Sequence, residues 1–328
     1  MGTPNEKRYE NCTYHRIGRS GLKVAPLSLG LWHNFGGDAS YDNCREMVLG
    51  AFDLGITHFD LANNYGPPPG SAEKMFGRIL KSELAAHRNE LLIATKAGYD
   101  MWPGPYGDFG SRKYLLSSLD DSLRRMGVDY VDIFYHHRPD PDTPLAETMG
   151  ALDSAVRSGK ALYVGLSNYN AAQLKQAYAV LAELKTPFVV NQVRYNMFDR
   201  AVEKELVATA DELGIGLTVF SPLAQGMLTE RYLQGVPADS RAGGASVFLN
   251  NSDITADRID KVRALGKIAA SRGQTIAQLA LAFVLRHASV SSVIVGASRL
   301  QQIVDCFGVT KKMSLSAEEL IQIETILS

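Results

Sequence analysis

The chain has 328 residues, of which 45% are hydrophobic and 21% charged, and its formal net charge of -1 gives no global attraction to nucleic acid or an anionic membrane. It contains no run of about 18 apolar residues that could span a bilayer, and its polar N-terminus lacks the apolar core of a signal peptide. The three cysteines (Cys12, Cys44 and Cys306) form no Cys-x-x-Cys pair, so a cytoplasmic protein with reduced thiols and no metal centre is expected.

Short apolar segments alternate with amphipathic segments along most of the chain. After a tail at 1–12, two short segments around Gly18 and Gly21 predict a β-hairpin. The predicted strands are 27–31, 56–61, 91–96, 130–137, 161–167, 188–193, 216–221 and 291–296. The predicted helices are 43–54, 72–84, 111–126, 145–158, 171–182, 200–213, 275–287 and 300–307. Two further helices are expected, at 255–271 within the long segment 224–272 and at 316–327 near the end.

The helix expected at 111–126 shows the signals most clearly. Ser111 is a candidate N-cap, leucines recur at helical spacing, and Gly127 ends the pattern. Eight strands that alternate with helices predict parallel pairing through right-handed crossovers, and eight strands close a barrel. The sequence therefore predicts an α/β fold, a single (β/α)8 barrel domain over 13–328, with an N-terminal hairpin and extra C-terminal helices.

Side chains that could take part in catalysis stand at or just beyond the ends of three predicted strands. Asp60 interrupts the end of an apolar strand, and Tyr65 lies in the polar loop beyond it. Lys96 closes the third strand, and the fourth ends in His136 and His137. Because the carboxyl ends of barrel strands share one mouth, these side chains are expected to converge there. The alternatives are ordinary ones: a helix-capping acid, a lysine that covers the rim with its stem, and a histidine that only closes a strand.

The chemistry of that group favours acid catalysis. A lysine beside a phenol is expected to lower the pKa of Tyr65, and Asp60 can pair with the lysine and hold it. A tyrosine tuned in this way can donate a proton to a carbonyl oxygen, and a neighbouring histidine can orient that carbonyl. The residues alone leave both His136 and His137 open for this role.

Several long motifs resemble the aldo-keto reductases. They are GITHFDLANNYG at 55–66, the strand ending in Lys96, YVDI at 130–133, GLSNY at 165–169 and GASR at 296–299. The segments LWHNFG at 31–36, GPPPGSAE at 66–73 and MWPGPYG at 101–107 are similar to the branch that holds bacterial L-glyceraldehyde 3-phosphate reductases and is related to potassium-channel β subunits. The resemblance covers the chain from about residue 14 onward.

The resemblance implies a catalytic tetrad of Asp60, Tyr65, Lys96 and His137, with Tyr65 as the general acid. The histidine position before Arg138 selects His137 over His136. The resemblance also implies NADPH as cofactor. No Gly-x-Gly-x-x-Gly follows a predicted strand, so a Rossmann domain is not supported. The positions implied to bind this cofactor are Trp32, Asp60, Tyr65, Ser167, Asn168, Gln192, Phe220, Ser221, Pro222, Leu223, Gly226, Gly296, Ser298, Arg299, Gln302 and Asp305. The family usually has Asn where this chain has Cys306, so Cys306 is not counted among the positions implied to bind the cofactor.

The substrate pocket is expected to contain Trp32 and Trp102 beside Tyr65 and His137. Both tryptophans fall just beyond strands, and packing at the rim is the alternative. The predicted function is reduction of small aldehydes or ketones, such as glyceraldehyde 3-phosphate or methylglyoxal. A Schiff-base aldolase and a slow redox-sensing subunit, like the channel partners, are the competing hypotheses. The resemblance also implies a homo-oligomer, a tetramer or larger.

Overall fold

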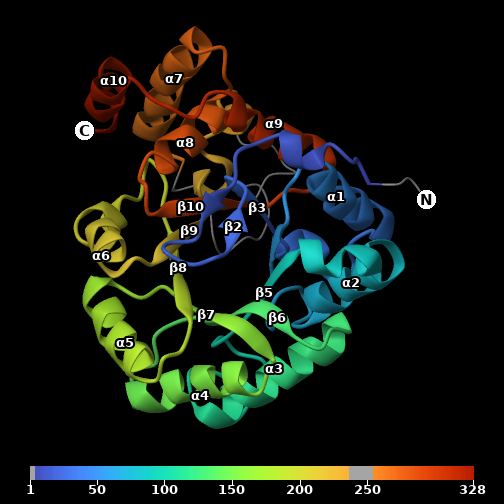
Figure 1. Cartoon of the computed structure of the whole chain (residues 1–328). Coiled ribbons are helices and arrows are strands. Elements are labelled where there is room, and N and C mark those ends of the chain that lie inside the picture. The colour runs from blue at the N-terminus through green and yellow to red at the C-terminus, as the bar shows by residue number, and fades with distance from the viewer. Residues whose placement is uncertain (1–3, 236–253) are drawn as a thin grey trace.

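The computed structural model describes residues 4–235 and 254–328 and forms a closed parallel barrel ringed by helices (Figure 1). The strand order around the barrel is β10-β3-β4-β5-β6-β7-β8-β9. Its eight strands are β3 (Leu27–Gly30), β4 (His58–Asp60), β5 (Leu92–Ala97), β6 (Val131–His136), β7 (Ala161–Ser167), β8 (Phe188–Arg194), β9 (Gly216–Phe220) and β10 (Val290–Val295). This confirms the (β/α)8 barrel predicted from the alternating pattern.

The helices lie on the outside of the barrel, where most of them cover the strands and two, at 256–271 and 317–327, pack mainly against other helices. They are α1 (Tyr41–Asp53), α2 (Ser71–Ile79), α3 (Arg112–Met126), α4 (Leu145–Arg157), α5 (Ala171–Glu183), α6 (Leu206–Leu213), α7 (Ala256–Ser271), α8 (Ile276–Val284), α9 (Leu300–Phe307) and α10 (Ala317–Leu327). In α3, the Ser111 side chain accepts a hydrogen bond from the Tyr114 N–H, and Gly127 ends the helix at φ 67°. Both capping signals read from the sequence are confirmed.

Two of the predicted helices are interrupted within their ranges. The helix expected at 72–84 ends at Ile79 and continues as a π-helical turn, η3 (Leu80–Leu84). The helix expected at 200–213 splits into a short 3-10 turn, η5 (Ala201–Glu203), and α6. Glu205 lies between them at φ -143°, outside the helical range, so the ladder of hydrogen bonds is interrupted there.

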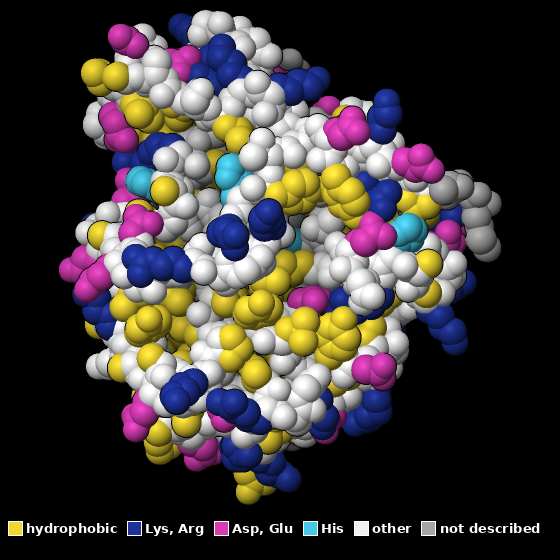
Figure 2. All heavy atoms as spheres, in the orientation of Figure 1, with side chains coloured by type: hydrophobic (Ala, Val, Ile, Leu, Met, Phe, Trp, Pro, Cys, Tyr) yellow, Lys and Arg dark blue, Asp and Glu magenta, His cyan; other side chains and the backbone are white. Residues whose placement is uncertain are grey.

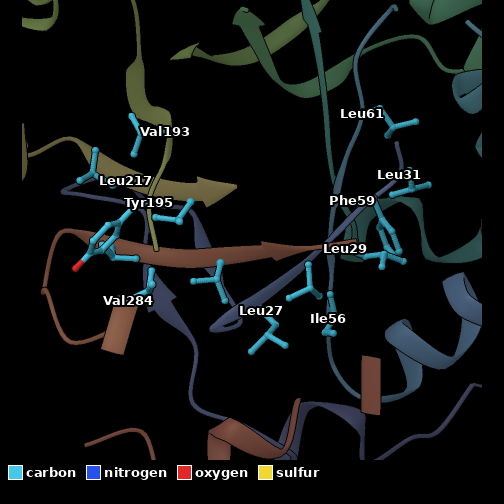
Figure 3. Packing of buried hydrophobic residues seen from close by; sticks show 14 of the residues in the cluster. Leu27, Leu29, Leu31, Ile56, Phe59, Leu61, Val193, Tyr195, Leu217 and Val284 are labelled. Atoms are coloured by element: carbon cyan, nitrogen blue, oxygen red, sulfur yellow. The ribbon is translucent and has the colours of Figure 1, made fainter. Parts of the chain in front are cut away.

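Alternation along each strand separates the packed core from the barrel interior. Leu27, Leu29 and Phe59 face outward toward the helices and are fully buried (Figure 3). The intervening residues, such as Gly30 and Asp60, face the inside of the barrel, since successive side chains in a strand point to opposite faces. Polar groups near the strand ends are thereby aimed at the barrel mouth.

The N-terminal hairpin closes the other end of the barrel. It pairs β1 (His15–Arg16) with β2 (Lys23–Val24) and lies in front of the strands in Figure 1. Ile17 and Val24 pack with Leu92 and Ile133, which belong to the barrel interior near the start of their strands. The interior is therefore sealed at the amino ends of the strands, and only the carboxyl ends can receive a ligand.

The face of the molecule seen in Figure 2 mixes acidic and basic side chains and shows no large area of one sign. This agrees with the near-zero net charge. Within the described part of the chain, no helix is both long and apolar enough to cross a membrane. The expected segment 224–272 lies partly outside the described residues, but α7 within it matches the helix predicted at 255–271.

Candidate active site

Asp60, Tyr65 and Lys96 meet at the open end of the barrel. Lys96 Nζ lies 2.7 Å from Asp60 Oδ2 and 3.3 Å from Tyr65 Oη. Asp60 is the last residue of β4, Lys96 faces inward from β5, and Tyr65 comes from the loop after β4. The convergence predicted from the strand ends is thus present in the geometry.

The lysine and the carboxylate are held from several sides. Lys96 Nζ also donates to the Leu61 carbonyl at 2.7 Å, so its three N–H groups each have an acceptor. Asp60 Oδ1 accepts from Gln192 Nε2 at 2.8 Å. Because Lys96 is fully buried and Asp60 is 2% exposed, neither side chain is free to turn toward bulk solvent.

The direction of the Tyr65 pKa corrects the expectation from sequence. Burial and the nearby Asp60 carboxylate hold the pKa of the Tyr65 phenol well above its usual value, rather than below it. Burial lowers the pKa of Lys96, and the paired Asp60 carboxylate opposes that decrease. In this enclosed site the cost of forming a phenolate outweighs the attraction of the ammonium, so Tyr65 stays a protonated donor at neutral pH.

Of the two adjacent histidines, only His137 lies in the site. Its ring centroid is 5.8 Å from that of Tyr65, in an edge-to-face arrangement. His136 points to the opposite side of β6, where its Nδ1 lies 2.7 Å from Tyr169 Oη. Burial and the charge of Lys96 lower the His137 pKa well below its ordinary value, which makes the ring neutral. His137 Nδ1 is buried without a hydrogen-bond partner among the described residues, so the ring N–H is assigned to Nε2.

A cavity of about 1170 Å³ includes Asp60, Tyr65 and His137 in its lining and extends across the barrel mouth. The predicted residues in its lining are Trp32, Asp60, Tyr65, His137, Ser167, Asn168, Gln192, Phe220, Ser221, Pro222, Leu223, Gly226, Gly296, Ser298, Arg299, Gln302 and Asp305. The structure therefore brings three tetrad positions and all the predicted cofactor positions to one cavity. Two predicted site residues are missing from the lining: Lys96, which is fully buried behind Asp60 and Tyr65, and Trp102.

The two tryptophans lie in different places. Trp32 stacks against His33 with ring centroids 3.8 Å apart, and its centroid is 6.0 Å from that of Tyr65. Trp102 is 39% exposed and packs edge-to-face on Tyr114 at 5.5 Å, which matches the rim alternative rather than an inner wall. The residue that closes this side of the cavity is Tyr99, whose ring meets that of His137 at 4.6 Å. Sequence reasoning missed Tyr99, although it follows the Lys96 strand by two residues.

The loop after β9 forms part of the cavity wall. Ser221, Ala224 and Gln225 all have positive φ values (53°, 47° and 60°), a strained conformation for residues with a Cβ. Gln225 Nε2 donates to Ser221 Oγ at 2.9 Å, and Asn196 Nδ2 donates to the Ser221 carbonyl at 3.1 Å. These bonds hold a tight turn directly after Phe220, whose ring is only partly buried at the cavity wall.

The far end of the cavity is built by the start of α9. Ser298 binds Gln302 through both its N–H and its hydroxyl, at 2.7 and 3.1 Å, and exposed Arg299 directly precedes the helix. Cys306 also lines this end, and burial raises the pKa of its thiol to about 12. It is therefore a neutral wall residue. Among residues 4–235 and 254–328, no three His, Cys, Asp or Glu side chains cluster closely enough to hold a metal ion.

Comparison with known proteins identifies the family. The model of the aldo/keto reductase family matches residues 26–328. The chain is 50% identical over 324 residues to an L-glyceraldehyde 3-phosphate reductase of Escherichia coli strain K12, covering 98% of this chain and 94% of that protein. It is 39% identical over 297 residues to a probable voltage-gated potassium channel subunit beta of Arabidopsis thaliana, covering 88% of each. The resemblance inferred from the motifs is confirmed, and the chain belongs to the aldo/keto reductase family of oxidoreductases.

Proposed function

We propose that this protein uses NADPH to reduce small aldehydes or ketones to alcohols. The observation that carries the proposal is the position of the Tyr65 phenol, 3.3 Å from Lys96 Nζ and beside the His137 ring in the lining of a large cavity. Glyceraldehyde 3-phosphate is a natural first substrate to assay because the E. coli relative carries that activity in its name. Methylglyoxal is the second, as a small carbonyl compound without a phosphate.

The tetrad residues have separate tasks in this reaction. The Tyr65 hydroxyl donates its proton to the carbonyl oxygen as negative charge develops there. The His137 Nε2–H orients the same oxygen, and the Lys96 ammonium stabilises the phenolate that remains. A reduced nicotinamide, when bound, supplies the hydride for the carbonyl carbon. Asp60 keeps Lys96 in place through the 2.7 Å ion pair.

The chain's own residues fit a dinucleotide of this kind. Phe220 offers an aromatic face at the cavity wall, and Ser167, Asn168 and Gln192 place hydroxyl and amide groups near it. The turn after Phe220 presents backbone groups at mid-cavity, where a pyrophosphate lies in an extended dinucleotide. At the far end, Ser298 and Arg299 supply a hydroxyl and a guanidinium at a helix start, a combination that suits a phosphate.

Two competing functions have less support. A Schiff-base aldolase needs a neutral, accessible amine, whereas Lys96 Nζ is fully buried and has three acceptors. A redox-sensing subunit with slow turnover, suggested by the channel-subunit relatives, keeps the cofactor site but gains nothing from the neutral His137 donor. An absorbance assay of NADPH oxidation tests the proposal. Sustained turnover supports the reductase, and a single burst without turnover would favour the sensing subunit.

The choice of NADPH over NADH is tested at Arg299. Replacing it by alanine is expected to weaken NADPH binding by about 1.5–3 kcal/mol, the usual range for hydrogen bonds to charged groups. NADH, which lacks the 2′-phosphate, should bind the variant almost as well as it binds the wild type. Fluorescence titration of both cofactors decides the matter, since equal losses would show that Arg299 does not recognise the phosphate.

The cytoplasmic location and the oligomeric state stay predictions. We infer a homo-oligomer, a tetramer or larger, by analogy with the family branch alone. Light scattering during size-exclusion chromatography measures the mass in solution, and a monomer of about 36 kDa would contradict the prediction.

A further inference from the structure

A second buried ion pair lies behind the tetrad. Glu73 on α2 is fully buried, and its Oε2 accepts a hydrogen bond from Arg125 Nε of α3 at 2.6 Å. Its other oxygen, Oε1, accepts from Thr95 Oγ1 at 2.6 Å. Thr95 precedes Lys96 in β5, so the carboxylate reaches the strand that carries the catalytic lysine.

The same ion pair also fixes the loop that carries Tyr65. The Ala72 N–H, in the first turn of α2, donates to the Tyr65 carbonyl at 3.3 Å. The Arg125 side chain packs against Gly70. A Cβ added to Gly70 would lie 2.8 Å from the Cδ of Arg125. Gly70 has φ 83°, which favours glycine, and it directly precedes α2. The end of the Tyr65 loop is thus held between α2 and Arg125.

We propose that Glu73 is a positioning residue for the Tyr65–Lys96 pair, because its carboxylate joins the helix that follows the Tyr65 loop to the strand of Lys96. Glu73 touches neither the cavity nor the reacting groups, and it acts through Thr95 and the start of α2. It also acts by charge. The negative charge of Glu73 helps to keep the buried Lys96 protonated, since it raises the Lys96 pKa against the lowering effect of burial. This inference rests on the proposed role of the tetrad in reduction.

The test compares Glu73→Gln with a matched control, Glu83→Gln. Glu83 lies in η3 and pairs with Arg45 of α1 at 2.8 Å, an interhelical ion pair with no contact to the tetrad. Glu73→Gln is expected to lower kcat roughly tenfold with KM nearly unchanged, as a small misplacement of catalytic groups does. The alkaline limb of its pH–rate profile, where activity falls as pH rises, should move to lower pH, because Lys96 then loses its proton more easily. The control should change neither kcat nor the limb.

A second variant separates geometry from charge. Thr95→Val removes the hydrogen bond to Glu73 and keeps the carboxylate and its Arg125 partner. It is expected to lower kcat while the alkaline limb stays in place. If Glu73→Gln fails to fold, Thr95→Val alone decides the geometric part. A kcat equal to the wild type in either folded variant, or an unmoved limb in Glu73→Gln, would overturn the proposal.

The Lys96 titration also gives a readout that does not depend on turnover. Its side-chain resonances can be followed by NMR as pH rises, in wild type and in Glu73→Gln. If the wild type reduces no carbonyl compound, the proposed function fails, yet a lower Lys96 pKa in Glu73→Gln would still support the inferred charge effect. An identical titration in both proteins would contradict it.

Discussion

Tyr65→Phe is expected to lower kcat by roughly two to four orders of magnitude, the usual contribution of a positioned proton donor. The substitution removes one oxygen and keeps the ring, so the contacts of Tyr65 with Trp32 and His137 remain. The Lys96–Asp60 ion pair does not depend on the phenol either. The loss should therefore appear in the chemical step and not in the fold.

The accompanying measurements locate that loss. NADPH affinity should barely change, because the phenol faces the substrate end of the cavity. Single-turnover kinetics with saturating NADPH measure the chemical step directly, and Tyr99→Phe is a matched control that removes a phenol from the same cavity wall. A Tyr65→Phe variant with near wild-type kcat would rule out Tyr65 as the proton donor.

The sequence predicted the barrel and the meeting of the tetrad because both follow from local patterns. Each strand is a short apolar run between capping signals, and parallel strands deliver their carboxyl ends to one mouth. Asp60, Tyr65 and Lys96 could be assigned to that mouth without a known register. The predicted strand ends differ from those observed by two residues or fewer, as at β4, where 56–61 became His58–Asp60.

The choice between His136 and His137 could not be made from the pattern of β6. All residues of this strand are buried, so its two faces have no contrast in polarity to show which one is inside. Pairing decides it. Lys96 faces the interior and pairs with Tyr135 of β6, so Tyr135 faces inward and His137, two residues later, does too. Register is a property of the folded sheet, so the sequence analysis had to select His137 from the family resemblance instead.

The pKa of Tyr65 and the packing of the loops could not be predicted from the sequence either. The expected lowering of the Tyr65 pKa considered only the charge of Lys96, whereas burial, which depends on the whole fold, has the larger effect. Trp102 follows a strand as Trp32 does, but its loop turns the side chain onto Tyr114. The Glu73–Arg125 pair joins residues that are 52 positions apart in the sequence, on two different helices, with no local signal in either.

Lys96→Met should remove most of the activity and should also destabilise the fold. Asp60 is 2% exposed and loses its cationic partner, and breaking a buried ion pair from one side costs about 3–5 kcal/mol. The unpaired Asp60 carboxyl destabilises the fold most when it is ionised. The loss of stability, measured by urea unfolding, should therefore be larger at pH 8 than at pH 5. A deficit independent of pH would mean that lost packing, not charge, is responsible.

The double variant Lys96→Met with Asp60→Asn isolates the charge. Since no unpaired carboxylate remains, this variant should regain much of the stability at pH 8 while it stays inactive. The alkaline limb gives an independent check. Burial lowers the Lys96 pKa and raises that of Tyr65, so the wild-type limb should report Lys96 losing its proton. Any residual activity of Lys96→Met should then persist to higher pH than in the wild type, and an unchanged limb would assign that titration to another group.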